Sequence, residues 1–342
     1  MTVIRTRPAA VAGLWLGGLL LLLLSIGFAI TIGPSSLGLS DVVRSVRAEV
    51  FGGDSGLSKL HESIIWRLRL PQSVLAAVCG AGLAVCGGVL QSLLRNPLAD
   101  PFVLGVSSGA SVGAVSVILL GVGAGVIGMA GGAFLGAVAA FAVVLVLARL
   151  AGGTTDRVVL AGIAATQLFS ALTSFIVYSS ADAEQTRSVL FWLLGSLSSP
   201  SWTEVAVCGA ATAIGLVVCV LTAGALDAFS FGNDAAAALG IDVTRIRLVL
   251  LTVTALMTAV IVSVSGAIGF VGLVLPHAAR AVVGVRHRVM MPTLAIMGAL
   301  FLVWADVVGR VVIAPRELPI GVITAIVGVP MFVLVLIRQG RR

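Results

Sequence analysis

Runs of about twenty apolar residues recur along the whole 342-residue chain, separated by short polar breaks. A run of this length crosses a bilayer as a helix, in which every backbone hydrogen bond is made within the segment. The strands of a membrane barrel would instead alternate apolar and polar residues over about ten positions. With 59% hydrophobic and only 10% charged residues, the chain is too apolar for a soluble domain. The sequence therefore predicts an all-α polytopic membrane protein.

We count ten spans, which we expect to form a single transmembrane domain over residues 1–342. The first run follows Arg5 and Arg7. It is longer than the apolar region of about 7–15 residues in a signal peptide, so we expect it to stay as a span. The predicted spans are 9–32, 71–93, 102–122, 126–150, 158–180, 202–226, 246–265, 268–284, 290–313 and 318–338.

Two longer breaks are expected on the outer side. Residues 33–70 are predicted to form a long outer loop. Residues 182–196 are too short and too polar at their ends to cross, so we expect an outer interfacial helix with Phe191 and Trp192 at headgroup level.

The longest cytoplasmic break is DAFSFGNDAAAALGIDVTRIR, residues 227–247. A short helix is predicted in it, with Asn233 as its N-cap and Gly240 as its C-cap. Two interpretations fit this pattern equally well: an ordinary connecting loop, and a docking element for a cytoplasmic partner.

The net charge of +7 is divided unevenly between the two sides of this topology. With the N-terminus inside, thirteen basic and five acidic residues face the cytoplasm, and eight basic and nine acidic residues lie outside. Because cytoplasmic loops carry an excess of Lys and Arg, this count predicts an N-in, C-in protein of the bacterial cytoplasmic (inner) membrane. No stripe of basic and aromatic residues is present, so we expect the lipid bilayer, and no nucleic acid, as a partner.

Several motifs that carry chemistry are missing from the chain. It has no G-x-x-x-x-G-K-[ST] motif for ATP and no G-x-S-x-G nucleophile motif. The four cysteines lie in apolar runs without C-x-x-C spacing, and His277 and His287 have no acid or Cys partners at ligand spacing, so no metal or other cofactor is expected. No span carries the midplane carboxylate pair or His–acid relay of a proton-coupled carrier. We therefore predict no catalytic residue, and uphill transport would take its energy from a partner.

The segment RNPLADPFVLGVSSGASVGA, residues 95–114, interrupts the apolar pattern between spans two and three. Pro97 and Pro101 disfavour helix at the residues before them, so a cytoplasmic turn is predicted here. The small residues that follow either allow close helix packing or line a polar path, and we favour packing. They include Ser107, Ser108 and Gly109.

Charged residues also mark the outer ends of two spans. Arg67 and Arg69 stand just before Pro71, which is a favourable first residue of a helix. Asp306 and Arg310 are four residues apart, so a salt bridge between them is predicted on one helix face.

Five blocks of sequence, in this order, resemble the FecCD-type permeases of iron-chelate, haem and cobalamin ABC importers. They are RLRLPQSVLAAVCGAGLAVCGGVLQSLLRNPLADPFVLGVSSGASVGA, GNDAAAALGIDVTRIR, IGFVGLVLPHAARAVVGVRHRVMMP, ADVVGR and ELPIGVITAIVGVPMFVLVL. The resemblance covers nearly the whole chain and is least clear before residue 60. It implies a ten-helix bundle like that of the cobalamin importer permease, with a second permease subunit, equal or different, around a central path. It also implies two cytoplasmic ATPase subunits and an extracytoplasmic substrate-binding protein.

The resemblance assigns roles to two sets of cytoplasmic residues. Asn96 and Leu98 match a gate at the cytoplasmic end of the path, and Thr155 and Asp156 match a second gate region. Part of the break at 227–247 resembles the coupling helix that sits in a cleft of the ATPase. Its residues are Gly232, Asn233, Asp234, Ala235, Ala238, Leu239, Gly240 and Asp242.

Outside, the resemblance implies docking of the binding protein through arginines. Arg69 and Arg310 match two such positions, while Gln72 departs from the third. Either Arg67 substitutes for that arginine, or docking uses fewer charges. Charges at the rim of an interface tune association rate and specificity more than affinity.

The mechanism implied is alternating access, in which ATP binding closes the ATPase pair, shifts the coupling element and rearranges the gates. A ferric siderophore is the first expectation for the cargo, followed by haem and cobalamin. Two other classes fit the composition alone: a stand-alone secondary carrier and a channel for a small solute. A neighbouring reading frame with G-x-x-x-x-G-K-[ST] would favour the importer.

Overall fold

The computed structural model describes residues 8–33, 37–123, 125–180, 182–314 and 316–339. Within these ranges all regular structure is helical, and no strand occurs. Seven helices are long and apolar enough to cross a membrane, and three further apolar helices occupy the remaining predicted spans. The seven are α1 (Pro8–Thr31), the continuous helix Lys59–Leu93, α6 (Gly128–Leu150), α7 (Thr155–Ser180), α9 (Trp202–Leu221), α12 (Val243–Ser265) and α14 (His287–Val311). The further three are α5 (Val106–Leu120), α13 (Val271–Val283) and α15 (Ile320–Gln339). The prediction of an all-helical chain is confirmed, while the crossing of all ten helices stays a prediction.

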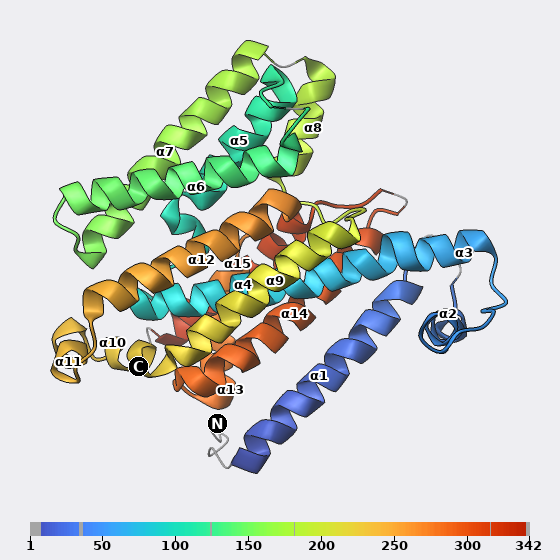
Figure 1. Cartoon of the computed structure of the whole chain (residues 1–342), viewed down its shortest axis with the longest axis horizontal. Helices are drawn as coiled ribbons and strands as arrows, with labels where there is room; N and C mark the ends of the chain where they lie inside the picture. Colours follow the sequence, from blue (N-terminus) through green and yellow to red (C-terminus); the bar gives the residue numbers. More distant parts are fainter. Residues whose placement is uncertain (1–7, 34–36, 124, 181, 315, 340–342) are drawn as a thin grey trace.

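The helices form one bundle around α4 (Leu70–Leu93), which is buried along most of its length. α4 packs against α14, α13, α9 and α12. A second group of α5, α6 and α7 lies on one side of this centre, with α6 against α12 (Figure 1). α1 lies on the other side, against α14.

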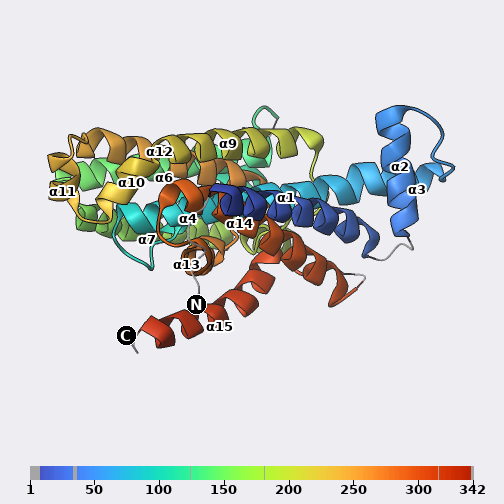
Figure 2. The same cartoon turned by 90° about the horizontal axis from the view of Figure 1, so that it is seen from below.

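The two ends of the bundle carry different short helices. α10 (Ala223–Phe229) and α11 (Asn233–Ala238) lie at one end, and α2 (Leu39–Phe51) and α3 (Lys59–Ser63) lie at the opposite end (Figures 1 and 2). The start of α1 and the end of α15 both point toward the α11 end. In the orientation predicted from charge, the α11 end is the cytoplasmic one.

Glycines bring α4 into close contact with its neighbours. A Cβ on Gly80 would lie 2.1 Å from the carbonyl oxygen of Gly298 on α14, and one on Gly87 would lie 1.9 Å from that of Gly272 on α13. Small residues at such crossings let helix backbones approach each other, which drives helix association in lipid.

The same packing joins α5 to α6. A Cβ on Gly109 would lie 2.4 Å from the carbonyl oxygen of Gly136, and one on Gly113 would lie 2.0 Å from that of Gly132. Ser108 is buried and donates its hydroxyl hydrogen to a carbonyl three residues earlier, at 3.0 Å. The structure therefore supports the packing interpretation of this small-residue segment.

The segment 33–70, predicted to be an outer loop, contains helices in both halves, with α2 in the first half. One helix runs without interruption over Lys59–Leu93, through the π-helical turn η1 (Ile64–Arg69). The N–H of Leu70 donates to a carbonyl five residues earlier. In an α-helix the ring of Pro71 would crowd the carbonyl four residues before it, and we attribute the passage of the helix through this proline to the wider turn.

α8 (Ala183–Leu193) confirms the short helix predicted for 182–196. Asp182 and Gln185 form a capping box at its start, each side chain accepting a backbone N–H of the other residue. Phe191 is exposed, so its place at headgroup level stays a prediction, whereas Trp192 is buried in the main core and is not available to lipid headgroups. The helix is amphipathic and packs against α5, so its two adjacent aromatic residues face different surroundings.

Candidate functional site at the α11 end

The predicted turn between α4 and α5 is present and is fixed by side-chain caps. Arg95 adopts a left-handed φ of +49°, which ends the helix. The Oδ1 atom of Asn96 then accepts the N–H of Leu98 at 2.9 Å. Asp100 accepts an N–H of the 3₁₀ turn η2 (Pro101–Leu104) at 3.0 Å. The Leu98 side chain is left exposed at the tip of the turn.

The carboxyl group of Asp100, in this turn, has a raised pKa. Burial raises the pKa of its carboxyl group to about 6, and the hydrogen bond from the Phe102 N–H opposes that rise only in part. Desolvation disfavours the charged form of an acid, which is the cause of the upward shift.

The short helix predicted in 227–247 is also present, but its caps differ from the prediction. Gly232, with a φ of +111°, is the N-cap, and Asn233 is the first helical residue. The Asn233 side chain instead accepts a hydrogen bond from Arg247 of α12 at 2.7 Å. At the other end Leu239 is the C-cap, and Gly240 follows it with a φ of +79°. Both glycines take backbone conformations that other residues reach only with strain.

The segment around α11 presents apolar side chains to solvent. Phe231 is 81% exposed and Leu239 is 72% exposed. Asp234 and Ala238 are exposed between them, and Asp242 caps the start of α12 by accepting the Arg245 N–H at 3.0 Å. Exposed large apolar residues within a polar rim are typical of an interaction surface.

A cavity of about 420 Å³ brings together residues of the turn that holds the first predicted gate, of the second predicted gate and of the predicted coupling element. Thr155 and Asp156 contribute the first turn of α7. The Arg95 guanidinium also reaches toward the coupling element, with Nη1 3.8 Å from where a Cβ on Gly232 would lie. Asn96 and Leu98 do not line the cavity, although they follow Arg95 closely in the chain. The lining residues are Leu94, Arg95, Thr154, Thr155, Asp156 and Asn233.

Polar contacts that the sequence analysis missed hold the last turn of α4. His287, expected in a loop, is the first residue of α14 and contacts both Ser92 and Asp227. On the other face, Gln91 accepts a hydrogen bond from Arg280 of α13 at 2.6 Å. The contacting residues lie 60 to 195 positions apart, so no local pattern could have indicated them.

The three arginines expected to dock a binding protein lie at the other end, in different surroundings. Arg67 is exposed. Arg69 is buried and donates to the Ile30 carbonyl at 2.6 Å. Arg310 is buried too, and donates to the Ile32 carbonyl at 3.4 Å. In this chain alone, two of the three therefore secure the end of α1.

The predicted ion pair between Asp306 and Arg310 is confirmed, at 3.0 Å. Gln72 joins it by donating to the second carboxylate oxygen of Asp306 at 2.9 Å. Gln72, which departs from the family pattern, therefore contributes a buried hydrogen bond to the ion pair.

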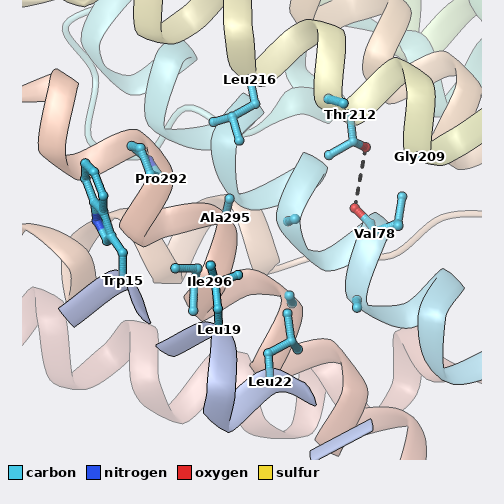
Figure 3. Close-up of a pocket in the computed structure, with 14 residues that line it drawn as sticks. Trp15, Leu19, Leu22, Val78, Gly209, Thr212, Leu216, Pro292, Ala295 and Ile296 are labelled. Carbon is cyan, nitrogen blue, oxygen red and sulfur yellow. Dashed lines mark hydrogen bonds between the residues drawn. The ribbon is translucent and has the colours of Figure 1, made fainter. Parts of the chain in front are cut away.

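A groove of about 400 Å³ with apolar walls lies between α1, α4, α9 and α14 (Figure 3). Leu19, Leu22, Leu216 and Ile296 line it, and no charged side chain does. The Thr212 hydroxyl in its wall already faces the carbonyl of Val78, at 3.5 Å (Figure 3). The groove has no group to recognise a polar chelate, so we leave it out of the candidate site.

In the described part of the chain, no three His, Cys, Asp or Glu side chains are grouped so that they could hold a metal ion. All four cysteines are free and buried, as expected for small apolar residues.

The chain matches the FecCD transport family over residues 20–338. It belongs to this family. The FecCD protein described here is 42% identical over 282 residues to the cobalamin import system permease BtuC of Halobacterium salinarum, with 82% of this chain and 75% of that protein covered. It is 38% identical over 284 residues to the hemin transport system permease HmuU of Yersinia pestis, with 80% and 84% covered.

A solved structure described as an inward-facing conformation of a metal-chelate type ABC transporter has the same fold, with a TM-score of 0.81 at 29% identity. The match covers 95% of this chain and 99% of that one. The FecCD chain is therefore a multi-pass permease of the cytoplasmic membrane and a transport component of an ABC importer.

Proposed function

We propose that this permease moves a bulky metal chelate inward by alternating access, driven by ATP binding and hydrolysis on a separate pair of ATPase subunits. A second permease subunit completes the path, and an extracytoplasmic binding protein delivers the cargo at the α2–α3 end. All ten apolar helices cross the bilayer, with both termini in the cytoplasm. The absence of an ATP motif from the sequence and the family membership support this division of labour.

The observation that carries the proposal is the juxtaposition at the α11 end. An exposed apolar surface around Phe231 and Leu239 adjoins the cavity that Arg95, Thr155 and Asn233 line. An ATPase bound to this surface would therefore act across one cavity from the second proposed gate, Thr155 and Asp156, and from Arg95, the residue before the first proposed gate. Binding energy changes a conformational equilibrium only if the two states bind the partner differently, and a cleft that closes around α11 provides that difference.

The cargo we expect first is a ferric siderophore, with haem and cobalamin next. Support for this class comes from the metal-chelate transporter with the same fold and from the cobalamin and hemin permeases. The path is proposed to run along α7 and to release its cargo past Asn96, Leu98, Thr155 and Asp156. Few fixed charges lie along α7, which favours a low-affinity path over a tight internal site.

Replacing Ala238 or Leu239 with Asp tests the coupling role. Both side chains are exposed, so the charge costs little in folding, but it would disrupt apolar packing against the ATPase. We expect normal insertion, with uptake lowered about tenfold or more, the size of effect seen when a hot-spot side chain of an interface is lost. Val126→Asp, at a 91% exposed position of the loop between α5 and α6, is the matched control and should transport normally. Unchanged uptake in Leu239→Asp would contradict the coupling role.

A further inference from the structure

Three side chains from three different helices meet at the end of α4. Ser92 lies in the last turn of α4, Asp227 lies in α10, and His287 begins α14. The Nε2 atom of His287 is 2.5 Å from the Ser92 hydroxyl oxygen, and its Nδ1 atom is 2.6 Å from Oδ1 of Asp227. The same Asp227 oxygen accepts the backbone N–H of His287 at 3.0 Å.

The His287 side chain is the buried centre of this group. It is 4% exposed, whereas the Asp227 side chain is 40% exposed and reaches solvent. The Ser92 hydroxyl also lies 3.0 Å from the Gly88 carbonyl of its own helix, so its one hydrogen has two possible acceptors. With Nδ1–H donated to Asp227, a neutral imidazole accepts that hydrogen at Nε2, whereas a protonated imidazole donates from both nitrogens and leaves it to Gly88. Because an unpaired buried polar group is costly, these contacts resist separation.

The last turn of α4 is tied on its other face as well. The Gln91 amide donates to the Leu273 carbonyl at 3.1 Å and accepts from Arg280 at 2.6 Å, both on α13. α4 therefore ends in a turn held by α13 on one face and by α10 and α14 on the other. Asn96, the proposed gate residue, follows Ser92 by four positions, and α11 follows α10 after a break of three residues.

We propose that Asp227, His287 and Ser92 are positioning residues that transmit the movement of α10 and α11 to the gate turn after α4. This inference rests on the proposed function of α11. The two elements also approach each other at the cavity that Arg95 and Asn233 line, where space separates their side chains. A chain of short hydrogen bonds centred on a buried imidazole moves as a unit, because breaking any one of them would leave a polar group unpaired.

The test uses the complete transporter in proteoliposomes, with its ATPase and binding protein. Uptake of radiolabelled cyanocobalamin, haemin and a ferric siderophore is measured in parallel with ATP hydrolysis. The variants are Ser92→Ala, Asp227→Ala and the conservative Asp227→Asn. Ser230→Ala is the matched control, since that hydroxyl donates only to the Leu226 carbonyl of its own helix.

We expect ATP hydrolysis to stay within about twofold of the wild type. Uptake per ATP should fall about tenfold in Ser92→Ala and Asp227→Ala, because each change leaves a buried imidazole nitrogen without its partner. Asp227→Asn keeps the oxygen that accepts both His287 N–H groups and should retain most of its uptake, and Ser230→Ala should be unchanged. The double variant Ser92→Ala/Asp227→Ala should be no worse than the worse single variant, because both changes break the same chain of hydrogen bonds.

Normal uptake per ATP in Ser92→Ala and Asp227→Ala would overturn the inference. The inference would also be overturned if assembly, ATP hydrolysis and uptake fell together and Asp227→Asn did not restore them. That result would mean that these residues only stabilise the fold. Failure of the wild-type transporter to take up any of the three probes with ATP would overturn the proposed function itself, and this inference with it.

Discussion

Charged residues are buried at the α2–α3 end of this apolar bundle, where they are paired and hold the end of α1. Arg310 and Asp306 are both almost fully buried, and Gln72 adds a hydrogen bond to Asp306. Arg69 reaches the Ile30 carbonyl in the same region. Removing one partner of a buried ion pair leaves the other charge unpaired, which costs far more than the pair itself contributes.

Arg310→Met should therefore lower the free energy of unfolding by roughly 3–5 kcal/mol. Arg67→Met, on an exposed side chain of the same region, should change it by less than about 0.5 kcal/mol. Thermal unfolding of the two variants in one detergent measures the difference. Equal stability would show that Arg310 is free to serve docking, as the family resemblance implies.

Asp100→Asn tests the electrostatics of the turn between α4 and α5. Because burial raises the pKa of the carboxyl group to about 6, the folded protein is favoured by protonation and gains stability as the pH falls from above 6 toward about 4. Asn carries no charge and keeps an acceptor for the Phe102 N–H, so the variant should be more stable by roughly 1–3 kcal/mol above pH 7. The two proteins should converge near pH 4. Melting temperatures of the wild type and the variant across this pH range test this prediction. A variant less stable than the wild type at pH 7.5 would contradict it.

Residue-level contacts were predictable from the sequence only where they are local. The spacing of Asp306 and Arg310 on one helix face is enough to predict their ion pair. Ser92 and His287 are 195 positions apart, and their contact depends on how α4 and α14 pack. A histidine without a local partner therefore looked isolated in the sequence, although it is the centre of a polar group in the fold.

At the scale of elements, apolar length predicts where helices lie but not how far they extend. Each predicted span contains a helix, because the bilayer leaves the backbone no other partner for its hydrogen bonds. The extension of α4 outward to Lys59 was not predictable, since Pro71 normally marks a helix start. The π-helical turn that lets the helix pass this proline has no sequence pattern of its own.

Glycine contacts between helices give a prediction at this scale. Gly113→Ala would place a methyl group 2.0 Å from the Gly132 carbonyl oxygen, so α5 and α6 must move apart. We expect a loss of about 1–3 kcal/mol in unfolding free energy. Gly209→Ala, where nothing lies within 4 Å of the new Cβ, should be neutral or stabilising by up to about 1 kcal/mol. Matching melting temperatures for the two variants would contradict the close packing.

Across the whole molecule, we propose that the α11 end binds the ATPase and that the α2–α3 end receives the binding protein. The side of the membrane on which each end lies can be measured. We expect a membrane-impermeant maleimide to label Leu239→Cys only from the cytoplasmic side and Phe51→Cys only from outside. The native cysteines are all buried, so the background should be low. Labelling of Leu239→Cys from the outside of intact cells would contradict the N-in, C-in orientation.

The central claim is that this chain has no energy source of its own and transports its cargo only with a partner ATPase. The most direct measurement is uptake of radiolabelled cyanocobalamin, haemin and a ferric siderophore by proteoliposomes of the complete transporter, with and without ATP on the ATPase side and with a proton ionophore. We predict uptake of one of these chelates that requires ATP and survives the ionophore. Uptake that proceeds without ATP and collapses with the proton gradient would contradict the claim.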